Sequence, residues 1–131
     1  MATQTIDGLL AAARAQLDRL DPAAAQAEVD GGALIVDTRC AEARRERGVI
    51  PGSIHIPLSV LYWRFDPTSG HNDARFSNRD GRYLLVCADG YSSSLAAATL
   101  RQLGFPRATD LDGGFNGWAG GGFPVRTLSA G

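Results

Sequence analysis

The sequence is poor in the features that mark several classes of protein. Its 131 residues contain no lysine, two cysteines and one methionine, and thirteen arginines against fourteen acidic residues leave a formal charge of -1. Without an excess of positive charge, neither a nucleic acid nor a membrane surface is an expected partner. No apolar run approaches the about 20 residues that span a bilayer, and residues 1–21 lack the basic stretch and apolar core of a secretory signal. The protein is therefore expected in the cytoplasm.

Cysteine and histidine are too scarce for a disulfide framework or a metal site. Cys40 and Cys87 could pair with each other, but a single disulfide is unusual in a core-forming domain without an export signal, so we expect two free thiols. The ligand clusters that a metal needs and the motifs that organic cofactors need are missing, so no cofactor is expected. The length fits one domain, and we expect residues 1–131 to form it.

Short apolar runs alternate with helical patterns along the chain. Apolar residues at three-to-four spacing favour a helix over residues 6–20, capped by Thr5, and a second helix runs from Asp21 and Pro22 to the glycines at 31–32. This alternation predicts an α/β domain, in which helices cover both faces of a parallel sheet. The other elements are expected as strands over 33–36, 53–56, 83–86 and 108–111, and as helices over 41–47, from 58, over 93–103 and after 113.

The segment 66–82 is polar and rich in Asp, Asn, Ser and Gly. Phe76 is its only large apolar side chain. Loops of this length are uncommon in compact domains, and they are often functional or mobile. We therefore expect a surface loop over 66–82.

Cys87 follows the apolar run 83–86 directly and precedes a helical segment. In an open α/β sheet, ligands bind beyond the carboxyl ends of the strands, where each loop leads into a helix. A short loop with Gly90 at its middle can point backbone N–H groups inward, and the helix after it adds the positive end of its dipole. Such a loop can stabilise a thiolate, the nucleophilic form of cysteine; lowering the pKa by about two units takes roughly 2.7 kcal/mol. The alternative is a buried core cysteine without chemistry.

Four motifs occur in an order that is typical of one superfamily. They are LIVDTR at 34–39, IPGSIHIP at 50–57, CADGYSS at 87–93 and LDGGFNGW at 111–118. With these motifs the chain resembles a single-domain member of the rhodanese superfamily. The resemblance implies a three-layer fold with a central parallel sheet of about five strands flanked by helices. It also implies a sulfurtransferase, in which Cys87 takes sulfane sulfur as a persulfide and passes it to a thiol or cyanide.

The same resemblance implies roles for individual residues and for partners. Asp37 and Arg39 would support the site, and Arg64 would either reach an anionic substrate or remain solvated. The partners would be a small sulfur donor and a thiol or cyanide acceptor, or a protein persulfide. The substrate-binding residues of the loop would be Ala88, Asp89, Gly90, Tyr91, Ser92 and Ser93, and the closing helix would be positioned by Gly113, Gly114 and Trp118.

The loop departs from its relatives in charge. Members that favour thiosulfate usually carry Arg or Lys in the loop, whereas this loop has Asp89 and no cation. Asp89 would oppose a thiolate unless it points to the rim, where water screens it, and a neutral or thiol-bound persulfide is a better expected donor than thiosulfate. Related phosphatases need a longer loop or an arginine six residues after the cysteine, where this chain has Ser93, so phosphatase or arsenate reductase activity is not favoured.

Other interpretations remain open. The domain could be a non-catalytic regulatory or sulfur-sensing binding module, because a fold alone does not determine an activity. Cys40 is expected to be structural or incidental, with a resolving thiol as the alternative. Tyr91 could gate the pocket or form a recognition surface, and the arginines of 44–47 could form a charged helix face or a docking patch for an acidic partner.

Overall fold

A computed structural model describes residues 3–128. In that range no helix is both long enough and apolar enough to cross a membrane. The strands are β1 (Leu34–Asp37), β2 (Ile54–His55), β3 (Tyr83–Val86) and β4 (Thr109–Asp110). The α-helices are α1 (Ile6–Ala15), α2 (Pro22–Asp30), α3 (Ala41–Arg47), α4 (Leu61–Phe65), α5 (Ser92–Gln102) and α6 (Gly114–Gly120), with 3-10 turns at Leu58–Val60 and Ala74–Phe76.

The four strands form one parallel sheet in the order β2-β1-β3-β4. All four expected strands are present, and the two outer ones are shorter than predicted. The described residues contain no fifth strand; Leu20 makes only a single parallel bridge to Leu111 beyond β4. Because the strands are parallel, their carboxyl ends meet at one edge, where the loops lead into helices.

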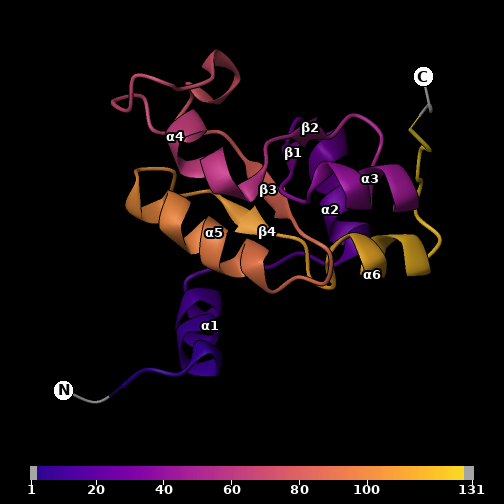
Figure 1. The fold of residues 1–131 in the computed structure, drawn as a ribbon, viewed down its shortest axis with the longest axis horizontal. Coiled ribbons are helices and arrows are strands. Elements are labelled where there is room, and N and C mark those ends of the chain that lie inside the picture. Colours follow the sequence, from indigo (N-terminus) through magenta and orange to yellow (C-terminus); the bar gives the residue numbers. More distant parts are fainter. Residues whose placement is uncertain (1–2, 129–131) are drawn as a thin grey trace.

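Helices cover both faces of the sheet, and the alternation of side chains along β3 divides the core. Tyr83 and Leu85 pack with α4 and α5, whereas Leu84 and Val86 pack with α2 and α6. Figure 1 shows these two helical layers with the sheet between them, and α1 beneath α5. The predicted three-layer α/β architecture is therefore confirmed.

The first helix is shorter than its apolar pattern predicts. It ends at Ala15, and within it only Ala13 is buried, while Ile6 is 65% exposed. The expectation of one helical face over 6–20 was wrong because the chain turns away to reach β4. There the Leu20 N–H donates to the Asp110 carbonyl, so tertiary pairing overrides local propensity.

The loop 66–82 is anchored in the core by Phe76. This ring is fully buried and stacks on Phe65 with centroids 4.1 Å apart, and Tyr83 and Phe105 meet the pair edge-on. Such aromatic contacts add to the free energy of burial. The buried Phe76 ring therefore ties the loop to the core, although most of the loop residues are exposed.

We predict that Phe76→Ala lowers the free energy of unfolding by about 3–5 kcal/mol, because a fully buried aromatic ring leaves a cavity. Urea denaturation followed by circular dichroism measures the change. Trp63→Ala is the matched control: the Trp63 side chain is 54% exposed, and its loss should change stability by less than about 1 kcal/mol. Equal losses in the two variants would contradict an anchoring role for Phe76.

Candidate active site

Cys87 lies where β3 ends at the carboxyl edge of the sheet. Five residues later the chain enters α5, which begins at Ser92. The Cys87 side chain is buried, with the residue 7% exposed, and both Cys87 and Cys40 are free thiols. The loop thus places one reduced sulfur atom at the position where α/β proteins bind ligands.

Three groups lie within hydrogen-bonding distance of the Cys87 sulfur. Gly90 N–H donates to Sγ at 3.1 Å, Ser93 N–H donates at 3.4 Å, and Ser93 Oγ lies 3.3 Å away. Burial raises the pKa of the Cys87 thiol, but hydrogen bonds from Ser93, Ser92 and Gly90 outweigh it, so the pKa lies below its ordinary value. The arrangement therefore favours the thiolate, as the cradle of inward N–H groups predicts.

The start of α6 holds the outer side of the loop. Phe115 N–H donates to the Cys87 carbonyl at 2.8 Å, and Asn116 N–H donates to the Ala88 carbonyl at 2.9 Å. Gly114 makes this approach possible: a Cβ on it would lie 2.6 Å from both carbonyl oxygens, and its φ is +61°. Close backbone contact thus explains the second glycine of the pair in the LDGGFNGW motif, and the left-handed φ of +82° explains the first, Gly113.

Asp89 lies on the rim of the loop, as expected. The residue is exposed, and its Oδ1 accepts a hydrogen bond from Asn116 Nδ2 at 2.8 Å. This contact holds the carboxylate outside, where water screens its repulsion of the sulfur anion.

A buried ion pair braces the end of β1 and reaches α6. Arg39 Nη2 lies 2.9 Å from Asp37 Oδ2, and Arg44 Nε lies 3.1 Å from the same oxygen. Burial raises the pKa of Asp37, but the hydrogen bonds from Arg39 and the charges of Arg39 and Arg44 outweigh this effect. The pKa of Asp37 therefore lies below its ordinary value. The Arg39 guanidinium also lies over the Phe115 ring, 3.9 Å from its centroid. Because Phe115 holds the Cys87 carbonyl, this pair can support the loop through α6.

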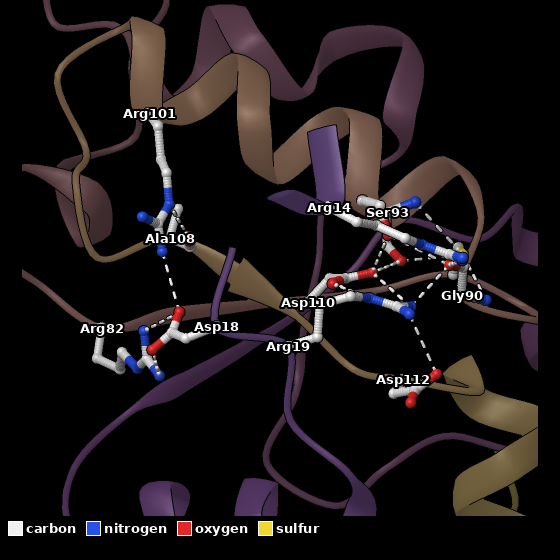
Figure 2. A network of polar contacts seen from close by, with 12 residues as sticks. Arg14, Asp18, Arg19, Arg82, Gly90, Ser93, Arg101, Ala108, Asp110 and Asp112 are labelled. Carbon is white, nitrogen blue, oxygen red and sulfur yellow. Dashed lines mark hydrogen bonds and ion pairs between the residues drawn. The ribbon is translucent and has the colours of Figure 1, made fainter. Parts of the chain in front are cut away.

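A second polar network behind the loop was not predicted from the sequence. Asp110, fully buried on β4, accepts from the Ser93 hydroxyl at 2.7 Å and from the Ser94 hydroxyl at 2.8 Å. Arg19 forms an ion pair with the same carboxylate at 2.9 Å, and Arg14 donates to Ser94 Oγ at 3.2 Å (Figure 2). Only the fold brings these residues together. The one signal of this network in the sequence was the presence of an acidic residue, Asp110, within a short β-prone run.

The remaining predicted residues are placed as follows. Tyr91 is 62% exposed and has the Arg14 guanidinium 5.5 Å above its ring. Arg64 donates to the His71 carbonyl at 3.2 Å, so the structure joins it to the 66–82 loop. Cys40 is exposed at the start of α3. Across residues 3–128 no group of three His, Cys, Asp or Glu could hold a metal ion.

Comparisons with known proteins identify the family. The family model described as Rhodanese-like domain matches residues 21–120. A curated relative from Pseudomonas syringae, the thiosulfate sulfurtransferase GlpE, is 35% identical over 79% of this chain and 88% of its own. The chain belongs to the rhodanese-like domain family.

Solved structures agree on the fold. A protein from Rhodopseudomonas palustris, described as of unknown function and a possible tyrosine phosphatase, is 30% identical with a TM-score of 0.88, covering 96% of this chain and 97% of its own. A rhodanese-related protein from Thermoplasma volcanium is 27% identical with a TM-score of 0.68, covering 84% and 98%. The first of these also spans the N-terminal part of the chain, which the family match does not include.

We predict that Cys87 reacts with iodoacetamide at a lower pH than a free cysteine does. In a Cys40→Ser background, the rate should rise with pH through a midpoint below about 8.5, because ionisation of the thiol limits the reaction. The loss of free thiol over time at a series of pH values measures it. A midpoint at or above that of free cysteine would show that burial outweighs the hydrogen bonds.

Gly114→Ala should disrupt the contact between α6 and the loop. The left-handed backbone alone costs a side chain roughly 1–2 kcal/mol, and the added Cβ would collide with two carbonyl oxygens. We expect unfolding to become easier by at least about 2 kcal/mol in urea titrations. Gly120→Ala is the control, since a Cβ there meets nothing within 4 Å.

Proposed function

We propose that this protein is a sulfurtransferase that carries sulfane sulfur as a persulfide on Cys87. The observation that carries the proposal is the environment of the buried Cys87 sulfur, to which the Gly90 and Ser93 N–H groups donate hydrogen bonds. In this environment the pKa of the Cys87 thiol lies below its ordinary value. A thiolate held in this way is the nucleophile that the reaction requires. The family match and the relative named thiosulfate sulfurtransferase support the same activity.

The reaction has two displacement steps at sulfur. In the first step, the Cys87 thiolate attacks the sulfane sulfur of the donor. A Cys87–S bond forms while the S–S bond of the donor breaks, so that sulfite leaves when the donor is thiosulfate. In the second step, an acceptor thiolate or cyanide attacks the outer sulfur of the persulfide, and Cys87 is released as a thiolate. Neither step needs a general base, because each nucleophile is already an anion.

The same N–H groups serve both states of the site. A persulfide carries its negative charge on the outer sulfur, about one S–S bond, or 2 Å, from the Cys87 Sγ. Donors that point into a short loop can stabilise charge on either sulfur atom. In this proposal the substrate-binding surface is formed by residues 88–93, and the contact of Arg64 with an anionic donor is a separate expectation.

The charge of the loop bears on the donor. Thiosulfate is a dianion, and the segment 88–93 contains Asp89 but no cation. We infer that a neutral or thiol-bound persulfide is a better donor than thiosulfate. A protein persulfide fits the same requirement, and a cytoplasmic location would keep Cys87 reduced for it.

Two other functions fit less well. A phosphatase needs bidentate pairing of phosphoryl oxygens by an arginine six residues after the cysteine, but Ser93 occupies that place and its hydroxyl donates to Asp110. A non-catalytic binding module that does not react with sulfur would not need a cysteine with a lowered pKa. The lowered pKa of the Cys87 thiol therefore favours the enzyme.

Intact mass spectrometry tests the proposal directly. After incubation with thiosulfate, or separately with a low-molecular-weight persulfide, the protein should gain the mass of one sulfur atom, and cyanide should remove it as thiocyanate. Cys87→Ser should gain none, whereas Cys40→Ser should behave as the parent does. No gain with any donor, or an equal gain in Cys87→Ser, would refute the proposal. Hydrolysis of an aryl phosphate that depends on Cys87 would support the phosphatase instead.

A further inference from the structure

Two arginines from outside the family match reach the centre of the active-site loop. Arg14 lies near the end of α1 and Arg19 in the turn after it, whereas the match begins at residue 21. Arg14 Nη2 donates to the Gly90 carbonyl at 2.8 Å, and Arg19 Nη2 donates to the same oxygen at 2.9 Å. Figure 2 shows both guanidinium groups converging on Gly90 from the side of the N-terminal segment.

Gly90 connects these arginines to the sulfur. Its N–H donates to Cys87 Sγ while its carbonyl accepts from both arginines, so the two ends of one residue face opposite sides of the loop. Its φ is +87°, and a Cβ there would lie 3.1 Å from Arg19 Nη2. The Gly90 carbonyl and N–H belong to neighbouring peptide planes that are joined at its Cα, so holding the carbonyl restricts the backbone rotations that would turn the N–H away from the sulfur.

Arg19 reaches the sulfur along a second route through β4. Its guanidinium contacts both oxygens of Asp110, at 2.9 and 3.3 Å. Asp110 in turn accepts from Ser93 Oγ, which lies 3.3 Å from Cys87 Sγ. Removing Arg19 would leave a fully buried carboxylate without its cation, which proteins tolerate poorly.

The balance of charge behind the loop is positive. Arg19 is paired with Asp110, but across residues 3–128 no acidic side chain lies within ion-pair distance of Arg14. Asp112, which pairs with Arg19 at 3.2 Å, is 64% exposed, and Asp89 is exposed on the rim, so water screens both. Burial lowers the pKa of Arg19, but Asp110, Asp112 and the charge of Cys87 raise it above its ordinary value. One partly buried positive charge thus remains beside the loop.

We propose that Arg14 and Arg19 are positioning residues of the sulfur-transfer site: the N-terminal segment 6–20 supplies, from behind the loop, the positive charge that residues 88–93 lack. Acting through Gly90 and Asp110, they hold the N–H donors toward Cys87 and stabilise the anionic sulfur of the thiolate and of the persulfide. The persulfide part of this inference rests on the proposed function, and the thiolate part does not.

The test compares charge-removing variants in the Cys40→Ser background. Arg14→Gln is the principal variant, because it leaves no buried carboxylate unpaired and so should fold. Arg19→Gln and Arg19→Lys extend the test. The readout is the pH dependence of iodoacetamide alkylation of Cys87, with the urea midpoint measured alongside. At a pH below the parent midpoint, Arg14→Gln and Arg19→Gln should each alkylate about threefold to tenfold more slowly, a pKa rise of roughly half a unit to one unit. Arg19→Lys should recover part of the loss.

Arg101→Gln is the matched control. Arg101 also joins the N-terminal segment to the domain, through Asp18 and the Ala108 carbonyl, in a separate network of Figure 2 that does not include the loop. It should leave the alkylation profile unchanged even if it lowers stability. A profile for Arg14→Gln equal to that of the parent, or an equal shift in Arg101→Gln, would overturn the inference.

Sulfur loading separates this inference from the proposed function. If the parent gains no sulfur from any donor, the proposed function fails, while a shifted alkylation profile still supports the role of the arginines. If the parent gains sulfur and all variants keep the parent profile, the proposed function stands and the arginine inference fails.

Discussion

Stabilising an anionic form of a buried sulfur atom is the constraint on which the rest of this candidate site depends: Cys87 is buried, and its pKa lies below its ordinary value. A buried charge costs several kcal/mol unless hydrogen bonds or opposite charges replace the water it has lost. Here the replacement comes from the backbone N–H groups of Gly90 and Ser93, which must point inward at once. Inward N–H groups leave carbonyl oxygens pointing outward, and each of these needs a partner of its own. The residues around the loop provide hydrogen-bond donors for these carbonyl oxygens.

The outward carbonyls are met by elements from opposite sides of the molecule. The amides at the start of α6 meet Cys87 and Ala88, and the arginines of the N-terminal segment meet Gly90. Each of these supports is fixed in turn by a buried carboxylate at the carboxyl end of a strand, Asp37 on β1 and Asp110 on β4. Buried ion pairs add little to net stability once desolvation is counted. Their contribution here is to hold the supports, and through them the loop, in one arrangement.

The residues of the loop itself could be predicted from the sequence, and those behind it could not. The apolar run before Cys87, Gly90 and the helix that follows are local signals, and they are sufficient to predict where the candidate site lies. Asp89 could also be placed, because an inward backbone forces its side chain outward. Arg14, Arg19 and Asp110 carry no such local signal, since they meet the loop only after the N-terminal segment and β4 have packed around it. The apolar spacing over 6–20 even predicted the opposite, a longer helix that would have carried Leu20 away from β4.

Phe76 was missed as a core residue for a similar reason. Its polar neighbours in the sequence indicate a surface loop, whereas its burial depends on contacts with Phe65 and Phe105 that form only in the folded chain.

The location of the positive charge also separates what the loop can bind from what it can stabilise. A cation within the loop would face the substrate and pair directly with a dianion such as thiosulfate, and an arginine at position 93 would do the same for a phosphoryl group. Arg14 and Arg19 instead donate to the Gly90 carbonyl, on the side of the loop away from the sulfur, so in our proposal they stabilise charge on the sulfur across the backbone and form no direct hydrogen-bonded pair with an incoming dianion. A site built in this way can lower the pKa of its cysteine without gaining affinity for dianions. The missing loop cation is therefore compatible with the proposed nucleophilic role of Cys87, and it is the reason why we propose a persulfide as a better donor than thiosulfate.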